Sequence, residues 1–93
     1  MITFEKMSGI LKVMGHPTRL KILAFILSTK CCGEECTVTQ IQENLDLPQS
    51  TISQHLRILK NIGIIKGHKN GTHVCYQVIN QYAESIIKMV NKE

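Results

Sequence analysis

The sequence has no acidic residue between Asp46 and Glu84, although both signs of charge are mixed elsewhere in the chain. Seven lysine, arginine and histidine side chains fall inside this gap: His55, Arg57, Lys60, Lys66, His68, Lys69 and His73. A protein that only has to stay soluble usually intersperses charges of both signs. A surface of one sign instead indicates a partner of the opposite sign, such as a nucleic acid.

Other features are also missing. No apolar run approaches the roughly 18–20 residues needed to cross a bilayer, so no membrane partner is expected. The N-terminal segment carries Glu5 and mixes polar with apolar residues, which is not the pattern of a signal peptide. There is no Cys-x-x-Cys pair, which argues against a small thiol oxidoreductase. We therefore expect a cytoplasmic protein that is not an enzyme, with its 93 residues forming a single domain over 1–93.

Apolar periodicity predicts a mostly α chain with about five helices. The expected helices lie at about 2–14, 17–29, 37–46, 49–61 and 79–91. The second is apolar nearly all round and should be central. Thr37 or Thr39 can cap the third, because each is followed by a Gln three residues later. The third and fourth helices, separated by a break at Asp46 to Pro48, predict a helix-turn-helix over about 37–62.

A β-hairpin is predicted over about 64–78, with Asn70-Gly71 as its two-residue turn. This register makes His68 and His73 direct cross-strand neighbours. One strand face should pack inward and carries Ile65, Gly67, Val74 and Tyr76; the other carries Lys66, His68, His73 and Cys75. A helix-turn-helix followed by a hairpin is a winged helix. The apolar stripes at 2–14 and 79–91 exceed what so small a core covers, which predicts a homodimer joined by these helices.

The fourth helix has the composition of a DNA recognition helix. Its first turns offer small or polar side chains that suit base edges and phosphates: Gln49, Ser50, Thr51, Ser53 and Gln54. Arg57 and Lys60 follow one and two turns later and are expected to meet phosphate. The predicted wing residues, against the backbone or minor groove, are Lys66, His68, Lys69, Asn70 and His73. The expected partner is double-stranded DNA.

Three segments resemble the ArsR/SmtB family of bacterial winged-helix repressors. They are "MGHPTRLKIL", "LDLPQSTISQHLRILKNIGII" and "NGTHVCYQV", and the resemblance covers about residues 7–90. It implies a homodimeric, sequence-specific transcriptional repressor that binds an imperfect palindromic operator and is released by an inducer. The family also places a histidine where His55 stands. That side chain either contacts a phosphate or orients the helix through a hydrogen bond.

The inducer site is expected at Cys31, Cys32 and Cys36, which lie beside Glu34 and Glu35. Thiolates suit arsenic or antimony, and thiolates with a carboxylate suit zinc or cadmium. The family's usual thiolate positions are occupied by Thr37 and Thr39, and residues 79–93 lack the histidines and aspartates of its other metal site.

Several alternatives remain open. The cysteines are redox or reactive-sulfur sensors, or they are inert. A metal set of His68, His73 and Cys75 on the wing is another candidate. A rival from a different functional class is a protein-interaction dimerisation module whose DNA face is vestigial.

Overall fold

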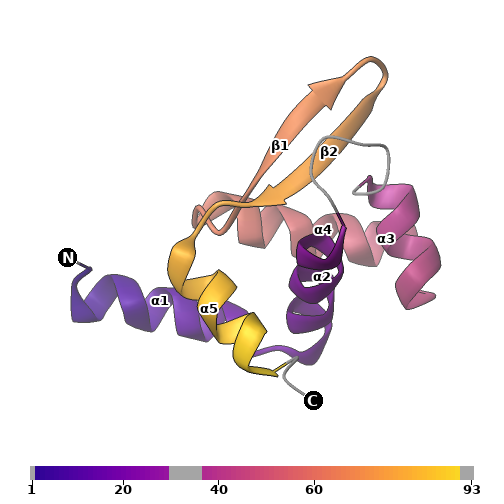
Figure 1. The fold of residues 1–93 in the computed structure, drawn as a ribbon. Coiled ribbons are helices and arrows are strands. Elements are labelled where there is room, and N and C mark those ends of the chain that lie inside the picture. Colours follow the sequence, from indigo (N-terminus) through magenta and orange to yellow (C-terminus); the bar gives the residue numbers. More distant parts are fainter. Residues whose placement is uncertain (1, 30–36, 91–93) are drawn as a thin grey trace.

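The computed structural model describes residues 2–29 and 37–90, which form five helices and one two-stranded antiparallel sheet (Figure 1). The elements are α1 (Phe4–Met14), α2 (Pro17–Ser28), α3 (Val38–Leu45), α4 (Gln49–Asn61), β1 (Ile65–Asn70), β2 (His73–Val78) and α5 (Gln81–Val90). Their order confirms the predicted winged helix-turn-helix. The cluster of Cys31, Cys32 and Cys36 lies outside the described residues.

Residues at or next to the first turn set where α1, α2 and α3 begin. Thr3 accepts a hydrogen bond from a backbone N–H in the first turn of α1. Pro17 stands at the first position of α2, where its missing N–H leaves no helical bond unmade. Thr37 caps α3 by accepting from the N–H of Gln40 at 3.3 Å, so Thr37 rather than Thr39 is the cap. Each start is therefore set by a residue visible in the sequence.

The end of α4 is a Schellman motif. The Gly63 N–H donates to the carbonyl of Lys60 at 3.1 Å, and the Ile64 N–H donates to the carbonyl of Leu59 at 3.0 Å. Gly63 has a φ of 82°, a left-handed conformation that glycine adopts without steric cost. This turn directs the chain from the fourth helix straight into β1.

The core is built around α2, as its apolar sequence predicts. Ile22 and Leu23 are completely buried, and α2 contacts α1, α3, α4, α5 and β2. The other buried apolar side chains come from every remaining element, including Ile10, Ile41, Ile52, Leu56, Leu59, Ile65, Val78 and Ile87. Among the described residues, no helix is long and apolar enough to span a membrane.

The hairpin differs from the prediction in its register. Asn70 pairs with His73, so the two-residue loop is Gly71-Thr72 rather than Asn70-Gly71. Gly71 has a φ of 67°, whereas Thr72 keeps a negative φ, which is the sign pattern of a type II′ turn. Glycine takes the first loop position because it alone has no Cβ to oppose a positive φ. As a result, His68 lies opposite Cys75 and not opposite His73.

The residues of the hairpin share faces as predicted, but the prediction that only one of the two faces packs inward needs correction. Ile65 is buried as predicted and Tyr76 is half-buried, but Val74 is 38% exposed. Cys75, expected on the outer face, is only 2% exposed. The hairpin is packed on both sides near its base, since β1 contacts α4 and β2 contacts α2. Alternation along one strand could not reveal this second layer.

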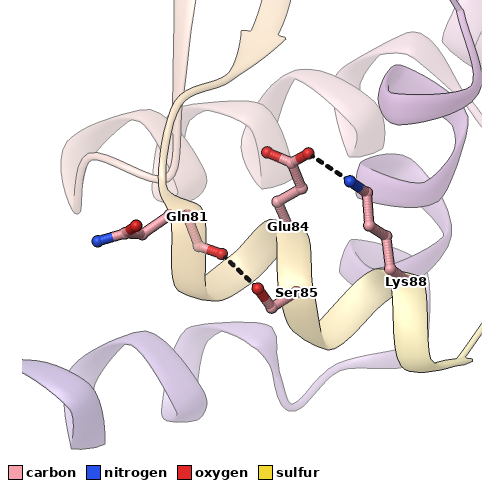
Figure 2. A network of polar contacts seen from close by, with 4 residues as sticks. All are labelled: Gln81, Glu84, Ser85 and Lys88. Atoms are coloured by element: carbon pink, nitrogen blue, oxygen red, sulfur yellow. Dashed lines mark hydrogen bonds and ion pairs between the residues drawn. The ribbon is translucent and has the colours of Figure 1, made fainter.

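The last helix separates polar from apolar side chains. Asn80 caps α5 by accepting from the backbone N–H groups of Tyr82 and Ala83, both at 3.0 Å. On its polar side, Lys88 and Glu84 form an ion pair at 2.8 Å, one turn apart (Figure 2). Ala83 and Ile87 are buried against the core, which confirms the predicted amphipathic helix.

Candidate nucleic-acid interface

The first turns of α4 present polar side chains to solvent. Gln49, Ser50, Ser53 and Gln54 are exposed, and Thr51 is half-buried. The opposite face is anchored in the core by Ile52, Leu56 and Leu59. Because the helix is held on one side only, its outer side is free to enter a groove of about its own width. This is the arrangement of a recognition helix in the DNA major groove.

The start of α4 has no side-chain cap. Pro48 occupies the capping position and makes no such hydrogen bond. The N–H groups of the first turn therefore have no acceptor from a capping side chain, and the helix dipole makes this end partly positive. Helix ends of this kind attract anions.

His55 lies behind the exposed face rather than on it. Its Nδ1 accepts a hydrogen bond from Arg19 Nε at 3.1 Å, and its ring meets that of His16 edge-on at a centroid distance of 4.8 Å. Burial, followed by the nearby His16 and Arg19, lowers the pKa of His55 below its usual value. The imidazole is therefore held neutral. Of the two roles left open by the sequence, the orienting hydrogen bond is present, and a phosphate contact by His55 stays a prediction.

Arg19 is a site residue that the sequence reasoning missed. Besides its bond to His55, its Nη1 donates to the carbonyl of Val13 in α1 at 3.1 Å. One guanidinium on α2 thus joins the end of α1 to the middle of α4. His16 stands beside it and caps α2 by accepting from the Thr18 N–H at 3.1 Å. The sequence offered only a weak signal, an arginine near the start of a largely apolar helix and close to His16.

The basic residues that follow on α4 are unpaired. Arg57 and Lys60 are exposed, and within the described part of the chain neither makes an ion pair or a side-chain hydrogen bond. The nearest acidic residues in sequence are Asp46, before α4, and Glu84, which is already paired with Lys88. The outer side of α4 therefore keeps an uncompensated positive charge.

The wing residues divide into two groups. Lys66, Lys69 and His73 are exposed, whereas His68 is half-buried and its Nε2 is 2.8 Å from Oε1 of Gln77. Asn70 ends β1 at the tip, opposite His73. The hairpin extends away from the helical body, so its tip is free to reach past α4 (Figure 1). His68 thus makes its hydrogen bond within the wing, while the exposed side chains of Lys66, Lys69 and His73 are available to a ligand.

The alternative metal set on the wing is not assembled. Cys75 is buried, His73 lies two residues away from it on β2, and His68 is bonded to Gln77. Across residues 2–29 and 37–90, no three histidine, cysteine or acidic side chains gather where they could hold a metal ion. Thr37 is buried and its hydroxyl caps α3, while Thr39 and His73 line a shallow recess of about 180 Å³.

A helix-turn-helix with an exposed second helix, followed by a basic hairpin, defines a winged helix DNA-binding protein. Residues 16–66 match the family model described as "bacterial regulatory protein, arsR family". The chain belongs to this family of DNA-binding transcriptional regulators, which are not enzymes. It is a repressor of the arsR type, and the resemblance noted in the sequence is confirmed.

Similar proteins span nearly the whole chain. An uncharacterized HTH-type transcriptional regulator of Methanocaldococcus jannaschii is 42% identical over 96% of both chains. The transcriptional repressor PagR of Bacillus anthracis is 38% identical over 97% of this chain and 86% of PagR. Its crystal structure superposes with a TM-score of 0.82, covering 94% of each chain. The arsenical resistance operon repressor of Staphylococcus xylosus is 31% identical over 91% of this chain and 77% of its own length.

Proposed function

We propose that two copies of this chain bind an imperfect palindromic operator in the cytoplasm and repress the adjacent promoter. The exposed polar face of α4, continued by unpaired basic side chains, is the observation that carries this proposal. In each copy α4 enters the major groove. Gln49 and Gln54 read bases, Ser50, Thr51 and Ser53 meet bases or phosphates, and the wing lies on the backbone.

The two contact classes are separated by paired substitutions. Gln54→Ala should weaken binding to an operator, selected from a random duplex library, by about 1–3 kcal/mol and barely affect random DNA. Lys69→Ala should weaken binding to both duplexes equally and reduce the salt slope by about one phosphate contact. The measurement is a salt titration of each variant on both duplexes.

Equal losses of affinity for Gln54→Ala on both duplexes would remove that residue from base reading. A wild-type chain that binds neither duplex at low salt would favour the vestigial interaction module.

We also propose that dimerisation uses α1 and α5. Both helices carry apolar side chains that the single chain leaves in solvent: Phe4 is 92% exposed, Leu11 50%, Met89 69% and Val90 59%. A groove of about 420 Å³ adjoins them, lined by Ile2, Gly9, Ile10 and Ile62 with Glu5, Lys6 and Asn80. A two-fold pairing would cover these surfaces and set two α4 helices about one DNA turn apart.

The inducer is proposed to be a soft metal or metalloid bound by Cys31, Cys32 and Cys36. The support is the chemistry of three thiols beside two carboxylates, together with a relative whose name is that of an arsenical resistance operon repressor. A bound cation would offset the repulsion among these anionic groups and tighten the connection that leads into α3. Release from DNA then requires that the cation bind the DNA-free form more tightly.

Replacing all three cysteines by serine tests this site. The variant should bind the operator normally and lose its response to As(III), Sb(III), Cd(II) or Zn(II), while Cys75→Ser, which changes a buried thiol elsewhere, should keep it. Operator binding is measured with and without each ion under reducing conditions. A triple variant still released by the same ion would remove the cluster from metal sensing. Release of the wild type by oxidants or persulfide alone would favour the redox alternative.

A further inference from the structure

A polar groove lies between α4 and the base of the wing. Its volume is about 400 Å³, and it is lined by Ser53, Leu56, Arg57, Lys60, Asn61 and Tyr76. Ser53, Arg57 and Lys60 are spaced by four and three residues, so they follow one side of α4. Leu56 is buried and forms the apolar floor. Tyr76 supplies the opposite wall from β2, and neither it nor Asn61 was among the residues predicted to bind DNA.

The position of the Tyr76 ring depends on its cross-strand partner, Gly67. A Cβ placed on Gly67 would lie 3.5 Å from Cε1 of Tyr76 and only 2.8 Å from Cγ1 of Val74. The ring therefore lies over a strand position that has no side chain. This packing keeps the phenol beside the groove, and it gives a physical reason for a glycine inside β1.

The phenol is suited to donate a hydrogen bond. Burial raises the pKa of Tyr76 above its usual value, so the hydroxyl keeps its proton at every physiological pH. Within the described residues the Tyr76 hydroxyl has no hydrogen-bond partner. Every fully buried side-chain oxygen or nitrogen there has a partner, so this unpaired hydroxyl is not fully buried. The unpaired hydroxyl is thus accessible to a ligand.

The charge of the groove is also unbalanced. Arg57 and Lys60 lie one turn apart on the same helix, where two like charges repel each other. Neither forms an ion pair with a described residue. An anion that enters between them removes this repulsion and gains charge-assisted hydrogen bonds.

We propose that this groove holds one phosphodiester of the operator backbone, with Tyr76 and Ser53 donating hydrogen bonds and Arg57 and Lys60 balancing the charge. This proposal rests on the DNA-binding function proposed above. The groove lies on the same side of α4 as Gln49 and Ser50. A DNA strand whose bases contact the start of α4 therefore continues into the groove. Tyr76 then fixes the register of α4 along the backbone, which base contacts alone do not do.

The first test removes only the hydroxyl. Tyr76→Phe should lower affinity about tenfold for both a selected operator and random DNA, with an unchanged salt slope, because the phenol is neutral and releases no counterion. Arg57→Gln should lower affinity and also reduce the slope by about one. Ser28→Ala is the control, since it removes an exposed hydroxyl from α2, outside α4, the wing and the two helices proposed to dimerise, and should leave affinity unchanged. Thermal unfolding of each variant verifies that the fold is retained.

The second test locates the phosphate. Each phosphate of the selected operator is replaced in turn by a neutral methylphosphonate, and binding of wild type and Tyr76→Phe is compared. At one position per half-site, the replacement should weaken DNA binding of the wild type strongly and that of Tyr76→Phe much less. This difference would show that the phosphate and the Tyr76 hydroxyl are energetically coupled. Additive losses at every position, or Tyr76→Phe binding like the wild type, would overturn the proposed site while DNA binding itself remains. Failure of the wild type to bind any duplex would instead overturn the proposed function.

Discussion

At the residue scale, the contact between Arg19 and His55 explains how the recognition helix is held. Arg19 contacts the carbonyl of Val13 on one side and the His55 ring on the other, so α1, α2 and α4 share one hydrogen-bonded group. His55 can accept only while Nδ1 carries no proton. The orientation of α4 is thereby linked to the protonation state of His55.

This link predicts a pH dependence of stability. The pKa of His55 is lowered in the folded chain by burial and then by the nearby His16 and Arg19, whereas in the unfolded chain it returns to about 6.5. The unfolded state therefore binds a proton first as pH falls, and the free energy of unfolding decreases below about pH 6.5 until the folded pKa is reached. The contribution is fully present above that window.

His55→Asn isolates the effect, because the Asn oxygen can accept from Arg19 without titrating. Urea unfolding of the wild type, at one protein concentration, should show a larger loss of stability from pH 7.5 to pH 5 than the variant. His73→Asn, at the exposed wing tip, should follow the wild type. Equal pH dependence in all three proteins would show that the lowered pKa of His55 does not contribute to folding.

At the element scale, the junction of α4 with β1 depends on one backbone conformation. Gly63 has a positive φ, and a Cβ added there would meet no atom within 4 Å. Any cost of Gly63→Ala is therefore backbone strain, expected to lower the free energy of unfolding by about 1–2 kcal/mol. Gly63→Asn should cost less, because asparagine tolerates this region better. Denaturant unfolding measures both, and equal losses would mean that side-chain packing rather than backbone conformation is at issue.

At the scale of the whole molecule, the exposed apolar side chains of α1 and α5 carry the proposed dimerisation. Phe4 is 92% exposed in the single chain, so Phe4→Ser should leave the fold of each copy intact. A two-fold dimer contains two copies of Phe4, so the substitution removes two buried side chains. Each contributes about 1.5 kcal/mol of burial free energy, so the dissociation constant of the dimer should rise about a hundredfold. Sedimentation equilibrium measures this constant. Val74→Ser, on the wing, is the control; a Phe4→Ser chain that dimerises as tightly as the wild type would exclude α1 from the interface.

The sequence by itself determined the family, the order of elements and the exposed face of α4. These follow from local rules: apolar residues at helical spacing, Thr37 and Pro17 at helix starts, and Gly63 at the end of α4. Each depends on residues within a few positions of one another, so no knowledge of distant contacts was needed.

Only the tertiary structure decided the contacts between elements. The bond from Arg19 to His55 joins residues 36 positions apart, and no spacing rule relates them. Cys75 is buried because the base of the wing packs on both sides, and the hairpin register follows from Gly71 rather than Asn70 taking the first loop position. Tyr76 faces α4 across a groove that neither element forms alone. Such features depend on how surfaces meet in space, which periodicity along one segment does not encode.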